Sequence, residues 1–285
     1  MDWRRLAAFA KKVYDGYSQD RVPAQAAALA YYTIFSLAPL LVIIVSIAGL
    51  FFGEKAAEGL IVEQIRQWVG DERTATMVQD MIAGASKKSS SIVATLISIV
   101  VLLWGASRVF VHLHDTLNLV WGYRPSSHAA VHAIRSRALS FFMVLSAGFL
   151  LLASLLLSAS LGTAFGYLRG LSGGLEVVWR LLDRVFNHGL TLLIFSLVFK
   201  LVPDERIAWG DVWAGALVTA VLYSLGRKLL GVYLGWGFLG SVYGAASSLV
   251  IVLFWVFYSS QILFLGAEIT WAYAGLYGSR RGTED

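Results

Sequence analysis

The sequence has no cysteine among its 285 residues, which excludes disulfides, cysteine-ligated zinc and a thiol nucleophile. Charge is also scarce: Asp, Glu, Lys and Arg make up 14% of the chain, whereas soluble domains carry about 25%. The stretch from Leu229 to Ala267 contains no ionised side chain at all. This scarcity favours one integral membrane domain over a pair of soluble domains.

Motifs for nucleotide binding and hydrolysis are missing or out of context. There is no Walker A sequence and no G-x-S-x-G elbow, which argues against an ATP-driven pump built from this chain alone. Gly235–Gly240 reads G-x-G-x-x-G, but it lies between two apolar stretches and not between a strand and a helix. We interpret these glycines as structural, because Gly231-x-x-x-Gly235 and Gly240-x-x-x-Gly244 allow close helix contact or a broken helix.

Long apolar runs are the main feature that the sequence does have. A bilayer core of about 30 Å needs about 20 helical residues to cross it. We therefore predict an all-α fold: an integral membrane bundle of six transmembrane helices with amphipathic interfacial helices. Pro39 lies inside the first span and should kink or split it. The spans are expected at residues 26–52, 91–111, 138–161, 189–202, 212–230 and 247–268.

The remaining segments are expected outside the bilayer. Residues 1–25 have an amphipathic pattern that fits an interfacial helix and equally a helix packed on the protein itself. Within the transmembrane domain of residues 26–275, residues 54–85 should form an extramembrane helical hairpin. Residues 170–186 should form a second surface-lying helix, and residues 276–285 a polar tail.

The distribution of Lys and Arg gives a slight bias for orientation. It favours cytoplasmic termini, with residues 54–89 on the outer side. The net charge of +5 is spread over many short loops. That distribution suits anionic lipid headgroups better than a nucleic-acid groove, which needs one basic face. We expect membrane lipids as partners and no nucleic acid; an envelope protein or a second copy of the chain stays open as a further partner.

Four sequence blocks occur in order at suitable spacing: Ala26–Leu40; Trp104–Ser107 with Asn118–Trp121; Pro203–Gly215; and Tyr243–Ala245 with Leu265–Glu268. Together they resemble the signature of the YihY/BrkB membrane protein family. The resemblance implies a six-span, multi-pass protein of the bacterial inner membrane. It also implies the family's labels: a virulence (serum-resistance) factor, an older ribonuclease BN label, and links to envelope lipid handling or transport.

The ribonuclease label can be examined on the histidines. Metal-dependent RNA cleavage needs clustered His and Asp ligands, and the nearest cluster is His112-Leu113-His114-Asp115. On a helix, side chains two positions apart point about 200° apart, so His112 and His114 cannot share a metal. We therefore expect no metal, no cofactor and no catalytic residue.

Polar residues at the ends of the predicted spans are the candidate functional or structural groups. They are Glu268, Arg108, Lys200, Asn118, Gln25 and Arg21. Glu268 is the leading one, because it ends the charge-free stretch and needs either water or a partner. We predict an ion pair between Glu268 and Arg108, Lys200 or Arg21. For the basic residues, snorkelling to the membrane surface is the ordinary alternative.

The expected function is that of a non-enzymatic inner-membrane protein that transports or handles a lipid or other envelope amphiphile. The alternative is a membrane scaffold that binds a partner protein, and a ribonuclease is a third and weaker alternative. A transporter should enclose a polar path bounded by Glu268 and basic residues. A scaffold should hold those residues in fixed pairs.

Overall fold

The computed structural model describes residues 3–69, 72–85, 107–123, 176–205, 207–235 and 247–280. Within these ranges the regular structure is helical and contains no strand, so the all-α class is confirmed for the described part. The six-span count is not established. One helix of the described part, Leu249–Leu276, is long and apolar enough to cross a membrane. The expected span at 138–161 and most of that at 91–111 lie outside the described residues.

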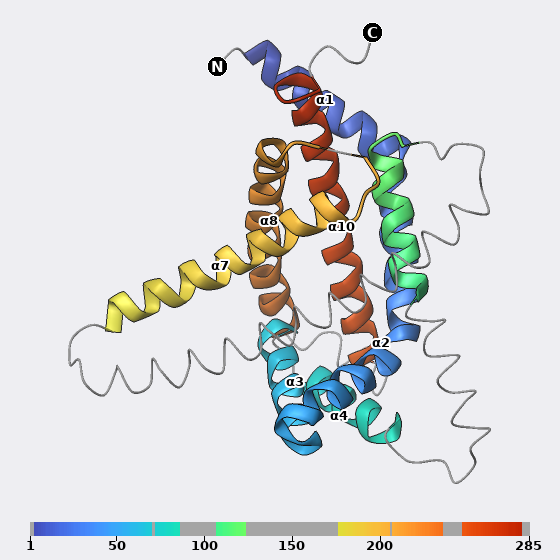
Figure 1. The fold of residues 1–285 in the computed structure, drawn as a ribbon, viewed down its shortest axis with the longest axis vertical. Coiled ribbons are helices and arrows are strands. Elements are labelled where there is room, and N and C mark those ends of the chain that lie inside the picture. The colour runs from blue at the N-terminus through green and yellow to red at the C-terminus, as the bar shows by residue number, and fades with distance from the viewer. Residues whose placement is uncertain are drawn as a thin grey trace.

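The longest charge-free segment forms the centre of the bundle. Helix α10 (Ser247–Leu276) packs against α8 (Trp209–Gly235) and α2 (Val22–Phe52), and α7 (Glu176–Leu201) packs on α8 (Figure 1). A helix over residues 107–120 completes this group. The large buried side chains of the shared core come from four of these helices: Trp121, Phe199, Phe264, Leu117 and Val22. Because the helices of this group contribute to one core, their ends are held in fixed relation.

Two reciprocal glycine contacts bring α8 and α10 close together. A Cβ on Gly215 would overlap the Thr270 hydroxyl, and a Cβ on Gly266 would overlap the Thr219 hydroxyl. Each threonine hydroxyl donates to the carbonyl of the glycine one turn before it: Thr219 to Gly215 at 2.7 Å and Thr270 to Gly266 at 2.8 Å. The hydroxyls are therefore satisfied within their own helices, and the glycines let the backbones approach. Of the glycines singled out from the sequence, Gly231 and Gly235 lie at the end of α8 and Gly240 and Gly244 lie outside the described residues, so the close packing expected of them stays a prediction.

Helix α2 links two hydrophobic cores. It continues without interruption past Pro39, so the helix is not split there, and its ribbon changes direction partway along (Figure 1). Its second half packs against α3 (Glu54–Val69) and α4 (Glu72–Ala85), the two helices found where the hairpin is expected. The buried members of this second core are Leu41, Val45, Ile61, Val62, Ala75, Val78 and Ile82.

Helix α7 corrects one expectation. The sequence pattern predicts a surface helix over 170–186 and a separate span from 189, but one helix, Glu176–Leu201, runs through both. Gly189, at which the separate span was expected to begin, lies within this helix. A glycine inside a helix costs only about 1 kcal/mol relative to alanine, so it does not by itself end a helix.

Helix α1 (Trp3–Gln19) lies across the C-terminal end of α10 (Figure 1). Its contacts with α10 reach the middle of that helix, where the Tyr17 hydroxyl donates to Gln261 Oε1 at 3.0 Å. No residue of α1 is buried, and Trp3 and Tyr14 are 79% and 70% exposed. Exposed Trp and Tyr on an amphipathic helix are typical of a membrane–water interface. The start of α1 and the end of α10 thus share one end of the molecule; the side of the membrane on which this end lies stays a prediction.

Candidate functional site

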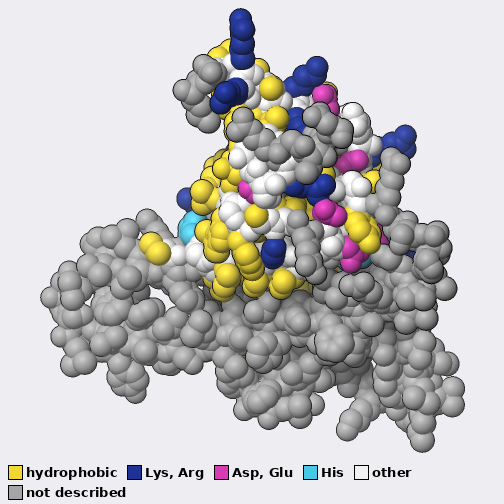
Figure 2. Space-filling model, turned by 45° about the horizontal axis from the view of Figure 1, so that its top comes forward, with side chains coloured by type: hydrophobic (Ala, Val, Ile, Leu, Met, Phe, Trp, Pro, Cys, Tyr) yellow, Lys and Arg dark blue, Asp and Glu magenta, His cyan; other side chains and the backbone are white. Residues whose placement is uncertain are grey.

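A cavity of about 500 Å³ lies where α1 crosses α10. Both apolar and charged side chains contribute to its wall, which is completed by the end of the 107–120 helix. Figure 2, turned so that this end of the molecule comes forward, shows charged side chains of both signs beside a band of apolar ones. The lining residues that bear on function are Lys11, Lys12, Gly16, Asp20, Glu268 and Trp271.

Glu268 is the deepest charged group in this wall. Its side chain is 3% exposed, although α10 carries it at the end of a long apolar helix. The carboxyl sits directly against Gly16 of α1, where a Cβ would overlap Oε2 and lie 3.1 Å from the carboxyl carbon. Within the described part of the chain, Oε1 is the buried side-chain atom that has no hydrogen-bond partner. An orphaned buried acceptor of this kind costs stability unless a donor reaches it.

Asp20 is the acidic neighbour of Glu268, and the turn between α1 and α2 positions it. The Asp20 amide donates to the Gly16 carbonyl at 2.9 Å, and Arg21 then adopts a left-handed conformation with φ 50° before α2 begins. Burial raises the pKa of Asp20, while a side-chain hydrogen bond with Glu268 lowers it by less. Two carboxyls this close favour a state in which they share one proton.

The predicted ion pair of Glu268 is therefore wrong. Among the described residues, no basic side chain forms a salt bridge with it. Lys200 instead donates to the carbonyl of Ile207 and lies 5.7 Å from the ring centre of Trp209. Arg108 and Arg21 are both exposed. The physical reason is geometric: the crossing of α1 over α10 seats Gly16 and Asp20 on the carboxyl before any of these three basic groups reaches it.

Lys11 and Lys12 supply the positive charge of the cavity. The sequence reading missed them, together with Gly16 and Asp20, because they belong to a helix more than 240 positions away from Glu268. One signal could have identified them. Ala8, Lys12, Gly16 and Asp20 follow i, i+4 spacing, so two small residues and two charges share one stripe that runs along the amphipathic helix and just past its end.

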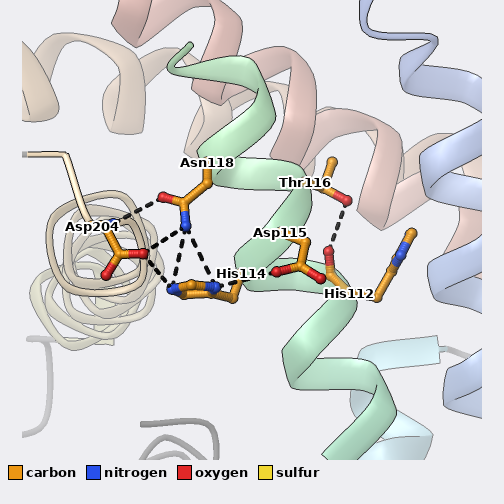
Figure 3. A network of polar contacts seen from close by, with 6 residues as sticks. All are labelled: His112, His114, Asp115, Thr116, Asn118 and Asp204. Atoms are coloured by element: carbon orange, nitrogen blue, oxygen red, sulfur yellow. Dashed lines mark hydrogen bonds and ion pairs between the residues drawn. The ribbon is translucent and has the colours of Figure 1, made fainter. Parts of the chain in front are cut away.

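A second polar cluster joins the 107–120 helix to the turn after α7 (Figure 3). Asn118 Nδ2 donates to Asp204 Oδ2 at 2.9 Å, and the Asp204 amide donates to Asn118 Oδ1 at 2.9 Å. His114 Nε2 lies 3.2 Å from the same Asp204 oxygen. Asn118 and His114 are 7% and 3% exposed. The candidate Asn118 thus fixes a turn, and its polar groups are occupied within the protein.

The two neighbouring histidines diverge, as the helical spacing predicts. His112 Nε2 lies 3.0 Å from the backbone carbonyl of Gln25, and its ring lies 5.4 Å from that of Tyr32 on α2. His114 faces Asp204 on the other side of the helix (Figure 3). Gln25 therefore takes part through its main chain. In the ranges that the structure describes, no group of three or more His, Asp or Glu side chains has the arrangement of a metal site.

Comparison with known proteins gives consistent matches along nearly the whole chain. The family model described as "Virulence factor BrkB" matches residues 13–284. A UPF0761 membrane protein of Psychromonas ingrahamii is 31% identical over 88% of this chain and 82% of its own length. One from Vibrio parahaemolyticus is 28% identical over 92% of this chain and 81% of its own.

A further relative extends this similarity, and solved structures add nothing to it. A UPF0761 membrane protein of Vibrio vulnificus is 26% identical over 98% of this chain and 86% of its own length. No solved structure matches. The match to the family model begins at residue 13, so it includes Gly16, Asp20, Glu268 and Trp271 of the site and leaves out Lys11 and Lys12. The chain is therefore a membrane protein and belongs to the virulence factor BrkB family.

Proposed function

We propose that this protein is a non-enzymatic, multi-pass inner-membrane protein that binds and moves an envelope amphiphile. The cavity between α1 and α10 is the observation that carries the proposal. Its volume of about 500 Å³ lies in the range of small-molecule sites. It combines apolar side chains such as Leu119 and Trp271 with Lys11, Lys12 and the buried Glu268. A lipid headgroup with its first acyl carbons presents the same mixture of chemistry.

The position of the cavity supports this proposal. Glu268 lies in Leu249–Leu276, the helix of membrane-spanning length and composition, near its C-terminal end. The overlying α1 exposes Trp3 and Tyr14, residues typical of the headgroup level of a bilayer. These two features favour a cavity at the level of the headgroups, and Glu268 in its wall belongs to the apolar helix. A lipid can reach such a site without leaving the membrane.

A scaffold that binds a partner protein remains the second function. It is supported by the fixed contacts of Lys200 with Ile207 and Trp209 and by the Asn118–Asp204 pair, which have structural roles. These contacts lie outside the wall of the cavity. They therefore do not account for a buried carboxyl that lines the same cavity as two lysines. The ribonuclease alternative gains nothing from the divergent His112 and His114.

A cavity-filling substitution tests the proposal. Ala8 lines the cavity and Ala7 does not, while both are exposed on α1. We expect Ala8→Trp to fill the cavity with little loss of stability, because exposed positions on a helix tolerate substitution. In proteoliposomes with a fluorescent phospholipid, dithionite quenching should show transbilayer movement by the wild-type chain. Ala8→Trp should reduce that movement at least about tenfold, a loss of about 1.4 kcal/mol of binding.

Ala7→Trp is the matched control and should move lipid at the wild-type rate. Equal rates for the two tryptophan variants would contradict a role for the cavity. Wild-type vesicles that move lipid no faster than protein-free vesicles would refute movement and leave the scaffold as the better reading.

A further inference from the structure

The cavity wall carries charges of both signs. Two of its carboxyls, Glu268 and Asp20, are joined by a side-chain hydrogen bond, and of these Glu268 is almost completely buried. Lys11 and Lys12 of α1 stand in the same wall. Asp15 is the remaining ionisable group that lines it. A ligand that carries only a negative charge would interact favourably with the lysines and would leave the buried Glu268 carboxyl without a donor.

The unpaired oxygen of Glu268 indicates that a ligand in this cavity should bring a hydrogen-bond donor. Oε1 is buried, has no hydrogen-bond donor from the described residues, and belongs to a side chain that lines the cavity. A cationic donor placed there would satisfy the oxygen and would also let Glu268 and Asp20 ionise together. Gly16 leaves no room for a side-chain donor on that face of α1, because a Cβ there already overlaps the carboxyl.

Resting on the proposed function, we infer that the cavity selects a zwitterionic phospholipid whose headgroup carries a primary ammonium. The ammonium lies against Glu268 Oε1 and Asp20, and the phosphate lies toward Lys11 and Lys12. A primary ammonium has three N–H donors for the unpaired oxygen. A trimethylammonium carries the same charge but has no N–H, and a glycerol headgroup has no charge. The cavity therefore binds headgroups in an order set by their N–H donors and not by their net charge.

The test measures headgroup preference with the purified full chain in detergent. Native mass spectrometry reads the fraction of protein that holds one short-chain phosphatidylethanolamine, phosphatidylcholine or phosphatidylglycerol. We expect the wild-type chain to prefer phosphatidylethanolamine over phosphatidylcholine by about tenfold, since a hydrogen bond to a charged group contributes about 1.5–3 kcal/mol. Glu268→Gln should bring that ratio close to one. Glu58→Gln, on α3 and outside the cavity, should keep it.

Two further binding measurements test the lysines and the need for acyl chains. Lys11→Gln combined with Lys12→Gln should weaken the binding of all three phospholipids and keep the preference among them. Glycerophosphoethanolamine, the same headgroup without acyl chains, should bind at least about tenfold more weakly, because each buried methylene contributes about 0.8 kcal/mol. Equal binding of this soluble compound would overturn the assignment to a lipid.

Two results would overturn the headgroup assignment: a wild-type ratio near one, or a preference that survives Glu268→Gln. Failure of this inference is distinct from failure of the proposed function. If the protein moves phospholipid in vesicles with no headgroup preference, the inference fails and the function stands. If it binds phosphatidylethanolamine selectively and moves none, the inference stands and movement fails.

Discussion

Replacing Gly215 with alanine is expected to lower the stability of the protein by about 1–3 kcal/mol, the usual cost of an overpacked core. The new methyl group would overlap the Thr270 hydroxyl and lie 2.8 Å from Thr270 Cβ and 3.0 Å from its Cα. Part of this obstacle is backbone, so a change of rotamer cannot relieve it. The measurement is the apparent melting temperature in detergent, compared with the wild-type chain.

Two variants make this result specific. Gly59→Ala on α3 introduces the same methyl group where nothing lies within 4 Å, and it should stabilise the protein by about 0.5–1 kcal/mol. Adding Thr270→Ala to Gly215→Ala should recover part of the loss, because the hydroxyl that meets the new methyl is gone. Equal melting temperatures for Gly215→Ala and the wild-type chain would show that α8 and α10 do not meet at this contact.

Glu268→Gln is expected to leave the protein at least as stable as the wild-type chain at pH 8. An ion-paired glutamate would behave in the opposite way, since removing one partner of a buried pair costs about 3–5 kcal/mol. Here the neighbour is Asp20, another carboxyl, so the substitution removes a like charge from a buried site. The amide of glutamine can also donate to the Asp20 carboxylate.

Glu268→Gln should also change how the stability of the protein depends on pH. The folded-state pKa of Asp20 is raised, chiefly by burial. Its contribution to stability is therefore fully present below the ordinary aspartate pKa of about 3.9 and is lost as pH rises through the raised value. The melting temperature of the wild-type chain should therefore fall as pH rises between these two pKa values. The melting temperature of Glu268→Gln should fall less over the same range. A steeper fall for Glu268→Gln, or a large loss of stability at pH 8, would contradict the proposed carboxyl pair.

Some of the architecture is predictable from the chain alone, because it depends on local patterns. The charge-free stretch before Glu268 anticipates the central helix α10, and the amphipathic start anticipates α1. The helices of the 54–85 segment lie where apolar residues recur at helical spacing. The fusion of two expected elements into α7 was missed because a polar Asn187-His188-Gly189 sequence resembles a boundary, while the backbone there simply continues as a helix.

The candidate site was predictable in its parts but not in its partners. Glu268 and Asn118 stand out as polar residues in apolar surroundings, whereas Asp20 and Asp204 stand in polar turns where acidic residues are ordinary. Which polar residue meets which depends on the crossing of helices far apart in sequence. The Gly-x-x-x-Thr spacing of Gly215–Thr219 and Gly266–Thr270 was visible, but a repeat of small residues does not reveal which copy packs.

The measurement that tests the central claim most directly is photocrosslinking by a phospholipid with a diazirine near its headgroup. In membranes that contain the wild-type chain, the label should appear on peptides that line the cavity, around Ala8, Leu119 and Trp271. Ala8→Trp should remove that label and Ala7→Trp should not. A label confined to exposed apolar residues of α8, such as Trp213 and Val221, and equal in all three proteins, would contradict a lipid site between α1 and α10.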